Sequence, residues 1–174
     1  MVATPTKSTV RFYPTRNDLP TDVREQVVAI LNKSLAATLD LKTQTKQAHW
    51  NVKGKDFYQL HELFDEMSGE MEEYVDMVAE RVTALGGTAL GTARMAADES
   101  ILPEYPVDAI DGNEHVMALA DRYAAYAKHV RAAIDATDAA GDADTADLYT
   151  EISRTIDKRL WFLESHLISR DNLA

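Results

Sequence analysis

The chain contains no cysteine among its 174 residues. Disulfide bonds, zinc sites built from thiolates and thiol nucleophiles are therefore excluded, and a chain without cysteine suits a reducing compartment. The N-terminus lacks the apolar run of a signal peptide, and no segment has the length and apolarity of a membrane span. We therefore expect a cytoplasmic protein with no membrane partner.

Basic side chains are also scarce, with 18 Lys and Arg residues against 29 Asp and Glu residues and a formal net charge of -11. A net-acidic surface repels phosphate backbones and attracts cations, so it disfavours nucleic acid and favours metal ions as partners. Apolar residues form 45% of the chain. A chain of 174 residues has the length of a single domain and is large enough to bury a substantial core.

Strand-like alternation is absent, and apolar residues recur at steps of three and four along four long segments. Helices are predicted from Thr21 or Asp22 to about Val52, over 57–85, from Asp111 as N-cap to before Gly141, and from there to about 168. Residues 1–20, which contain three prolines, are predicted as an extended arm, 21–168 as one bundle and 169–174 as a short tail.

The connection over about 86–112 is longer than neighbouring antiparallel helices need, and it is predicted to contain a short helix around Thr92 to Asp98. At the start of the third long helix, Asp111 followed by Glu114 three residues later matches a capping box. Four helices with one long crossover predict an all-α, ferritin-like four-helix bundle.

Nitrogen and carboxylate side chains of the kind that bind divalent metals are concentrated between His49 and Arg81. At about 100° per residue, four of these side chains share one face of helix 57–85, within an arc of about 100°. They are His61, Asp65, Asp76 and Glu80. The step from His61 to Asp76 nevertheless spans about 22 Å along the helix, whereas a metal holds its ligands at roughly 2 Å. One copy of the helix cannot close one site with all four.

A second copy of the helix, lying antiparallel, would place His61 and Asp65 of one chain opposite Asp76 and Glu80 of the other. A two-fold axis produces this arrangement and generates two equivalent sites. The alternative interpretation is a solvated, charged helix face. A di-iron centre inside one bundle is disfavoured, because such centres use Glu-x-x-His pairs and none of the five histidines has Glu three residues before it.

The motif H-W-N-x-x-G-x-x-F-x-x-L-H-x-x-F-D, followed by D-x-x-A-E-R, resembles the ferroxidase signature of the Dps family, the starvation-induced mini-ferritins. The segments Y-P-T-R-N-D, L-G-G-T-A-L-G-T, A-D-R-Y, D-T-A-D and W-F-L-E-S extend the resemblance from about Tyr13 to Ser165. The resemblance implies a hollow shell of twelve subunits with metal sites at its two-fold interfaces. One chain would supply His49, His61 and Asp65, and its partner would supply Asp76 and Glu80.

The resemblance also implies an activity. Family members oxidise Fe(II) at this site, preferentially with hydrogen peroxide, and store the Fe(III) as mineral inside the shell, which protects DNA from oxidative damage. Carboxylates suit Fe(III), neutral imidazoles suit Fe(II), and zinc or another divalent metal also suits these ligands.

Other side chains have both a functional and a structural interpretation. Trp50 beside His49 could intercept oxidising equivalents or simply pack at the end of its helix. Glu72 falls within the ligand arc and is a candidate for a further metal contact. An acidic stripe beside the ligand face could nucleate mineral or be solvated surface. It consists of Glu62, Glu66, Glu70 and Glu73.

Several carboxylates surround the turn into the last helix, where they could cap it and complement its dipole. They are Asp138, Asp142, Asp144 and Asp147. The resemblance implies that this region lines pores that admit cations, which favours Asp142 and Asp147 as pore residues. The remaining histidines have no ligand partner at a suitable spacing and are predicted to be structural or exposed. They are His115, His129 and His166.

Three competing functions remain open. Many Dps proteins compact the nucleoid through lysine-rich tails, but residues 1–20 contain one lysine and two arginines, so weak or absent DNA binding is expected at physiological salt. The sequence H-E-L-F-D differs from the metalloprotease motif H-E-x-x-H by Asp65 in place of the second histidine. A purely structural helical bundle would show no site-specific binding of iron.

Overall fold

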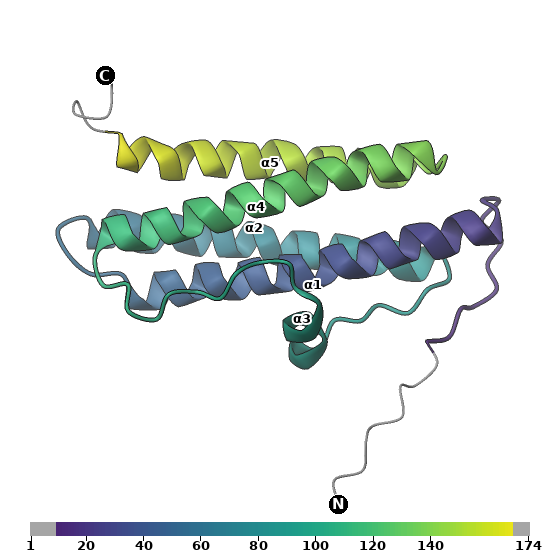
Figure 1. Ribbon diagram of the computed structural model, residues 1–174, viewed down its shortest axis with the longest axis horizontal. Coiled ribbons are helices and arrows are strands. Elements are labelled where there is room, and N and C mark those ends of the chain that lie inside the picture. The colour runs from purple at the N-terminus through teal and green to yellow at the C-terminus, as the bar shows by residue number, and fades with distance from the viewer. Residues whose placement is uncertain (1–9, 169–174) are drawn as a thin grey trace, which may run out of the picture.

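The structure is a computed structural model, and it describes residues 10–168. Four long helices form two antiparallel pairs stacked on one another, with a fifth, short helix beside the first pair (Figure 1). The helices are α1 (Thr21–Asn51), α2 (Phe57–Ala84), α3 (Ala93–Glu99), α4 (Gly112–Ala139) and α5 (Ala143–Leu167). The predicted all-α bundle of four long helices with a short helix in its crossover is confirmed.

The pairing of the helices follows from the lengths of their connections. Short turns join α1 to α2 and α4 to α5. The two helices within each of these pairs contact one another more extensively than they contact any other helix. The long connection after α2 runs along α1 and passes through α3 before α4 begins (Figure 1). Within residues 10–168, no helix is long and apolar enough to cross a membrane.

Local signals in the sequence account for several helix ends. Asp111 accepts a hydrogen bond from the backbone N–H of Glu114 at 3.0 Å, and the Glu114 carboxylate accepts one from the N–H of Asp111 at 3.1 Å. This reciprocal pair is the predicted capping box, and it fixes the start of α4. The turn after α1 contains Gly54 at φ 107°, a conformation that glycine adopts without a steric penalty.

The segment before α1 is extended and is held against the end of α2. The N–H of Tyr13 donates to the carbonyl of Gly86 at 2.6 Å, and a Cβ at Gly86 would lie 2.5 Å from the Tyr13 carbonyl oxygen. Arg24, which is buried, donates to the carbonyls of Leu19 and Leu85. Residues 1–9 of the predicted arm and residues 169–174 of the predicted tail lie outside the described residues.

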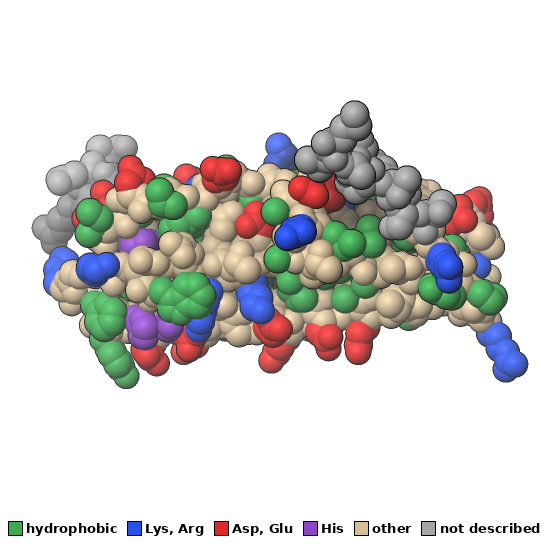
Figure 2. Space-filling view, turned by 90° about the horizontal axis from the view of Figure 1, so that it is seen from below, with side chains coloured by type: hydrophobic (Ala, Val, Ile, Leu, Met, Phe, Trp, Pro, Cys, Tyr) green, Lys and Arg blue, Asp and Glu red, His purple; other side chains and the backbone are tan. Residues whose placement is uncertain are grey.

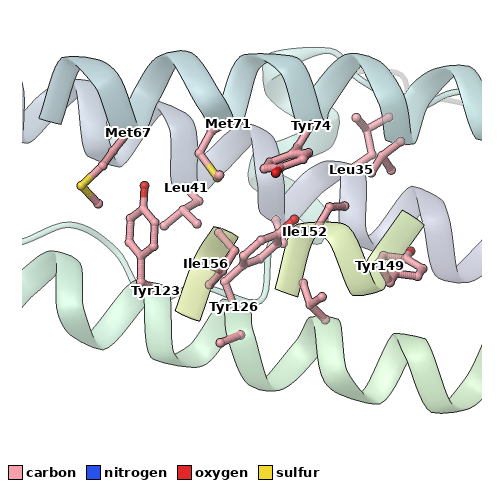
Figure 3. Packing of buried hydrophobic residues seen from close by; sticks show 14 of the residues in the cluster. Leu35, Leu41, Met67, Met71, Tyr74, Tyr123, Tyr126, Tyr149, Ile152 and Ile156 are labelled. Atoms are coloured by element: carbon pink, nitrogen blue, oxygen red, sulfur yellow. The ribbon is translucent and has the colours of Figure 1, made fainter. Parts of the chain in front are cut away.

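The core between the two helix pairs is apolar but contains four tyrosines whose hydroxyls all find partners (Figure 3). Each tyrosine bonds a serine or threonine hydroxyl on a facing helix. The pairs are Tyr74 with Thr155, Tyr123 with Thr45, Tyr126 with Thr38 and Tyr149 with Ser34. Burial raises the pKa of all four phenols, so they remain neutral at physiological pH.

Candidate metal site

His49 and His61 face one another across the turn that joins α1 and α2. His49 lies near the end of α1 and His61 lies one turn into α2, so the short turn brings their rings into a stack with centroids 3.8 Å apart. Nδ1 of His49 lies 2.8 Å from the carbonyl oxygen of His61, and Nδ1 of His61 lies 2.9 Å from that of His49.

These reciprocal hydrogen bonds determine the tautomer of both rings. A carbonyl oxygen only accepts, so Nδ1 of each ring must be the donor and must carry the proton. In the neutral rings, Nε2 then holds the lone pair that can bind a metal. Holding the second ring nitrogen on a carbonyl is the usual way in which proteins orient a metal-binding histidine.

Asp65 completes the group on this chain. It lies one turn after His61 on α2, and its Oδ1 is 3.9 Å from Nε2 of His49. The Nζ of Lys46, on α1, forms an ion pair with the same carboxylate oxygen. The hydrogen bond from Lys46 is the main cause of a lowered pKa for Asp65, so the carboxylate is ionised at neutral pH.

Asp76 and Glu80 lie further along the same helix. Because α2 is continuous from Phe57 to Ala84, they remain separated from His61 and Asp65 by the helix rise. Both carboxylates are exposed. In the part of the chain that the structure describes, no three His, Asp or Glu side chains are arranged to hold a metal ion. One chain therefore presents two separate halves of the predicted ligand set.

A shallow groove with a volume of about 820 Å³ runs between α1 and α2 beside Asp65. Its walls include Lys42, Lys46, Asp65, Gly69 and Glu72, and Lys42 forms an ion pair with Glu72. Acidic side chains line one edge of the molecule near a histidine (Figure 2).

Comparison with known proteins identifies the family. A ferritin-like domain model matches residues 28–170. The DNA protection during starvation protein of Agrobacterium fabrum is 46% identical over 158 residues, which cover 91% of this chain and 98% of that protein. The chain belongs to the Dps family.

Solved structures of Dps proteins share the fold over nearly their whole length. DpsC from Streptomyces coelicolor aligns with a TM-score of 0.86 and 35% identity, covering 92% of this chain and 93% of that chain. The Dps protein of Vibrio cholerae O1, described as a member of a broad superfamily of ferritin-like diiron-carboxylate proteins, aligns with a TM-score of 0.84. It is 25% identical, over 91% of this chain and 99% of that one.

Trp50 follows His49 but points away from the core of this Dps chain, since 66% of its surface is exposed. It lines the groove next to Lys46 and Asp65. Packing within its own chain therefore does not explain this tryptophan, which stays a candidate for a redox role or for a contact with another copy.

The acidic stripe beside the ligand face divides into two parts. Glu62, Glu66 and Glu73 are exposed, whereas Glu70 is half-buried and accepts two hydrogen bonds of 2.7 Å from the buried guanidinium of Arg159. This ion pair ties α2 to α5. The exposed Glu66 also forms an ion pair with Arg159, at 3.5 Å. Glu62 and Glu73 are therefore better placed for mineral nucleation than Glu66 and Glu70, which their own chain already neutralises.

Asp142, one of the two predicted pore residues, is buried. It is the N-cap of α5, and only 2% of its surface is exposed. Its carboxylate accepts hydrogen bonds from the backbone N–H of Thr145 at 3.0 Å, from its hydroxyl at 2.5 Å and from Arg81 at 2.7 Å. The capping interpretation explains this residue, and among the two predicted pore residues only Asp147 is exposed.

The three other histidines are structural or exposed, as predicted. His115 is buried with Nδ1 2.5 Å from the hydroxyl of Tyr105, and His129 lies with Nε2 2.9 Å from the hydroxyl of Ser34. Burial lowers the pKa of both rings. His166 is exposed near the end of α5.

Lys46 was not among the residues singled out in the sequence, although it lies one helical turn before His49. Its ammonium group forms an ion pair with Asp65, one of the predicted metal ligands. We expect Lys46→Met to increase the affinity of the metal-free protein for Co(II), a divalent spectroscopic probe, because the metal would no longer compete with a resident cation. Titration followed by visible absorption would measure this; unchanged or weaker binding would contradict it. Lys33→Met, an exposed lysine on α1 away from the groove, is the control.

Proposed function

We propose that this Dps chain oxidises Fe(II) with hydrogen peroxide at sites shared by two copies, and that an assembled shell stores the Fe(III) product as mineral. The observation that carries the proposal is the reciprocal bonding of His49 and His61. It leaves Nε2 of both imidazoles available to a metal, and Nε2 of His49 lies 3.9 Å from the ionised Asp65. The Asp76 and Glu80 carboxylates of a second copy would complete each site.

The donor set fits iron as the substrate. Neutral imidazole nitrogen suits Fe(II), and carboxylate oxygens stabilise the greater charge of Fe(III), so this combination favours oxidation of the bound ion. Two Fe(II) ions each give one electron to one peroxide molecule. Its O–O bond breaks and its two oxygens take up two protons and become water. Two-electron reduction in one event avoids the release of hydroxyl radical, which explains how iron oxidation would protect DNA.

The relatives support the proposal through their descriptions. The A. fabrum relative is named for DNA protection, and the V. cholerae relative is placed among diiron-carboxylate proteins. A closed shell of twelve copies with two-fold interfaces is the assembly that would both complete the sites and enclose a mineral. Protection by this chemistry requires no contact with DNA, which agrees with the net charge of -11.

Anaerobic titration with Fe(II) followed by addition of peroxide tests the proposed function. We expect saturable binding of Fe(II) and oxidation of two Fe(II) ions per peroxide, with a sedimentation coefficient that corresponds to about twelve chains. Zinc, which cannot be oxidised, should compete for the same sites. A monomeric protein, or oxidation of Fe(II) no faster than in buffer, would contradict the proposed function. A salt-sensitive shift of plasmid mobility would instead favour DNA binding as the function.

A further inference from the structure

Gly69 lies in the interior of α2, where a glycine needs an explanation. Glycine in the interior of a helix costs about 1 kcal/mol relative to alanine. The residue is exposed, and a Cβ built on it would meet no atom within 4 Å in the described chain. Its backbone does not have a positive φ. Packing and conformation within one chain therefore do not require glycine here.

The position of Gly69 becomes informative when the two halves of the ligand set are compared. His61 and Glu80 are equally distant from a point between residues 70 and 71, and so are Asp65 and Asp76. A two-fold axis that brings these pairs together must pass at this level. Gly69 and Glu72 are centred on the same point, each about 2 Å from it along the helix. Gly69 of one copy would therefore face Glu72 of the other.

The charges around this point allow two copies of the same acidic face to approach. Lys42 and Lys46, both on α1, form ion pairs with Glu72 and Asp65 of the same chain. The carboxylates of Asp76 and Glu80 make no ion pair among residues 10–168. Glu72 near the centre and Asp65 on one side of it are thus neutralised within the chain, whereas Asp76 and Glu80 on the other side keep free carboxylates for a partner's histidines.

We propose that the α2 helices of two copies cross at Gly69, and that the missing side chain permits the close approach that joins the half-sites. The proposal rests on the shared site described under the proposed function, and it adds the register of the interface and a positioning residue. Helices pack 8–10 Å apart, depending on the side chains at their contact. A metal site tolerates little change in that distance, because its ligands must all lie at roughly 2 Å.

Replacing Gly69 by alanine should have opposite effects on the stability of the helix, which should rise, and on the rate of iron oxidation at the shared site, which should fall. Gly69→Ala should leave the helical circular dichroism intact and should stabilise the isolated helix, yet it should slow peroxide-dependent iron oxidation. Gly69→Leu should shift sedimentation toward smaller species and lower the oxidation rate by about 100-fold, the loss that a misplacement of about 1 Å causes. Ala124→Leu, which enlarges an exposed residue of α4, is the matched control and should behave like the unsubstituted protein.

Cross-linking tests the register without relying on activity. Because the chain has no cysteine, every disulfide in a variant comes from the introduced residues. When chains with Gly69→Cys are mixed with mass-tagged chains carrying Glu72→Cys and then oxidised, a tagged heterodimer should form. Mixing Gly69→Cys with Glu73→Cys, which points about 100° away around the helix, should form much less.

The outcomes separate this inference from the function on which it rests. If the unsubstituted protein assembles and oxidises iron but Gly69→Leu does the same at an equal rate, the role of Gly69 is wrong. Equal cross-linking from position 69 to positions 72 and 73 would show that the register is wrong. If the unsubstituted protein neither assembles nor oxidises iron, the proposed function itself fails.

Discussion

Replacing His61 and Asp65 together by alanine is expected to lower the rate of peroxide-dependent Fe(II) oxidation by more than about 100-fold. The change removes one Nε2 and one carboxylate from the half-site that α1 and α2 build. Loss of residues that merely orient metal ligands already costs 10–100-fold in affinity or activity, and loss of two ligands must cost more. Stopped-flow absorbance of Fe(III) measures the rate, and circular dichroism verifies that the helices remain.

The matched control for that variant is Glu164→Ala with His166→Ala, which removes an exposed carboxylate and an exposed imidazole from α5. We expect this control to oxidise iron normally. Unchanged kinetics in the His61 and Asp65 variant would contradict the assignment of the site. A loss of activity in both variants would instead point to a general effect of removing surface charge.

Complementation tests whether two chains share each site. The variant without His61 and Asp65 and a variant without Asp76 and Glu80 should each be inactive alone. In a coexpressed mixture, a mixed pair contains one intact site and one site that lacks all four side chains. Random pairing gives mixed pairs about half of the time, so about a quarter of the original sites should return. A site built within a single chain would not recover at all.

The sequence was sufficient to predict the helices because their signals are local. The apolar repeat of α2, the glycine in the turn before it and the capping box of Asp111 and Glu114 each depend on residues within one or two turns. The separation of the two half-sites could also be predicted, because it depends only on the rise of an unbroken helix.

Contacts between helices could not be predicted in this way. Lys46 beside Asp65 and Arg159 beside Glu70 each join side chains from different helices, and only the packing of the bundle decides which groups meet. The same limit explains why the burial of Asp142 could not be predicted. A carboxylate in an acidic turn suggests a solvated or pore-lining group, whereas the guanidinium that buries it lies on α2, far away in the sequence.

Arg81 shows how one of these contacts supports the candidate site. It follows Glu80 directly, and its guanidinium donates to Asp142 at 2.7 Å and to the hydroxyl of Thr145 at 2.8 Å. The last turn of α2 is thereby fixed to the first turn of α5. The D-x-x-A-E-R motif thus ends in a structural residue that holds the helix end carrying the second half of the ligand set.

Asp142→Ala is expected to lower the free energy of unfolding by about 3 kcal/mol, because it leaves the largely buried Arg81 without its ion-pair partner and removes the N-cap of α5. Urea unfolding followed by circular dichroism, at one fixed protein concentration, measures the change. Asp157→Ala is the control, since it breaks an ion pair with Arg131 in which both side chains are more than half exposed and should cost about 1 kcal/mol or less.

The same substitution separates the capping role of Asp142 from a role in a pore. A residue whose function is to admit cations would affect the rate of iron entry but not the stability of the chain. Asp147→Ala, at an exposed position one turn into α5, should therefore slow iron entry if a pore lies there, and it should leave the urea midpoint unchanged. Equal stability of Asp142→Ala and the unsubstituted protein would refute the capping role, because the largely buried Arg81 and the N-terminus of α5 cannot both lose the Asp142 carboxylate without cost.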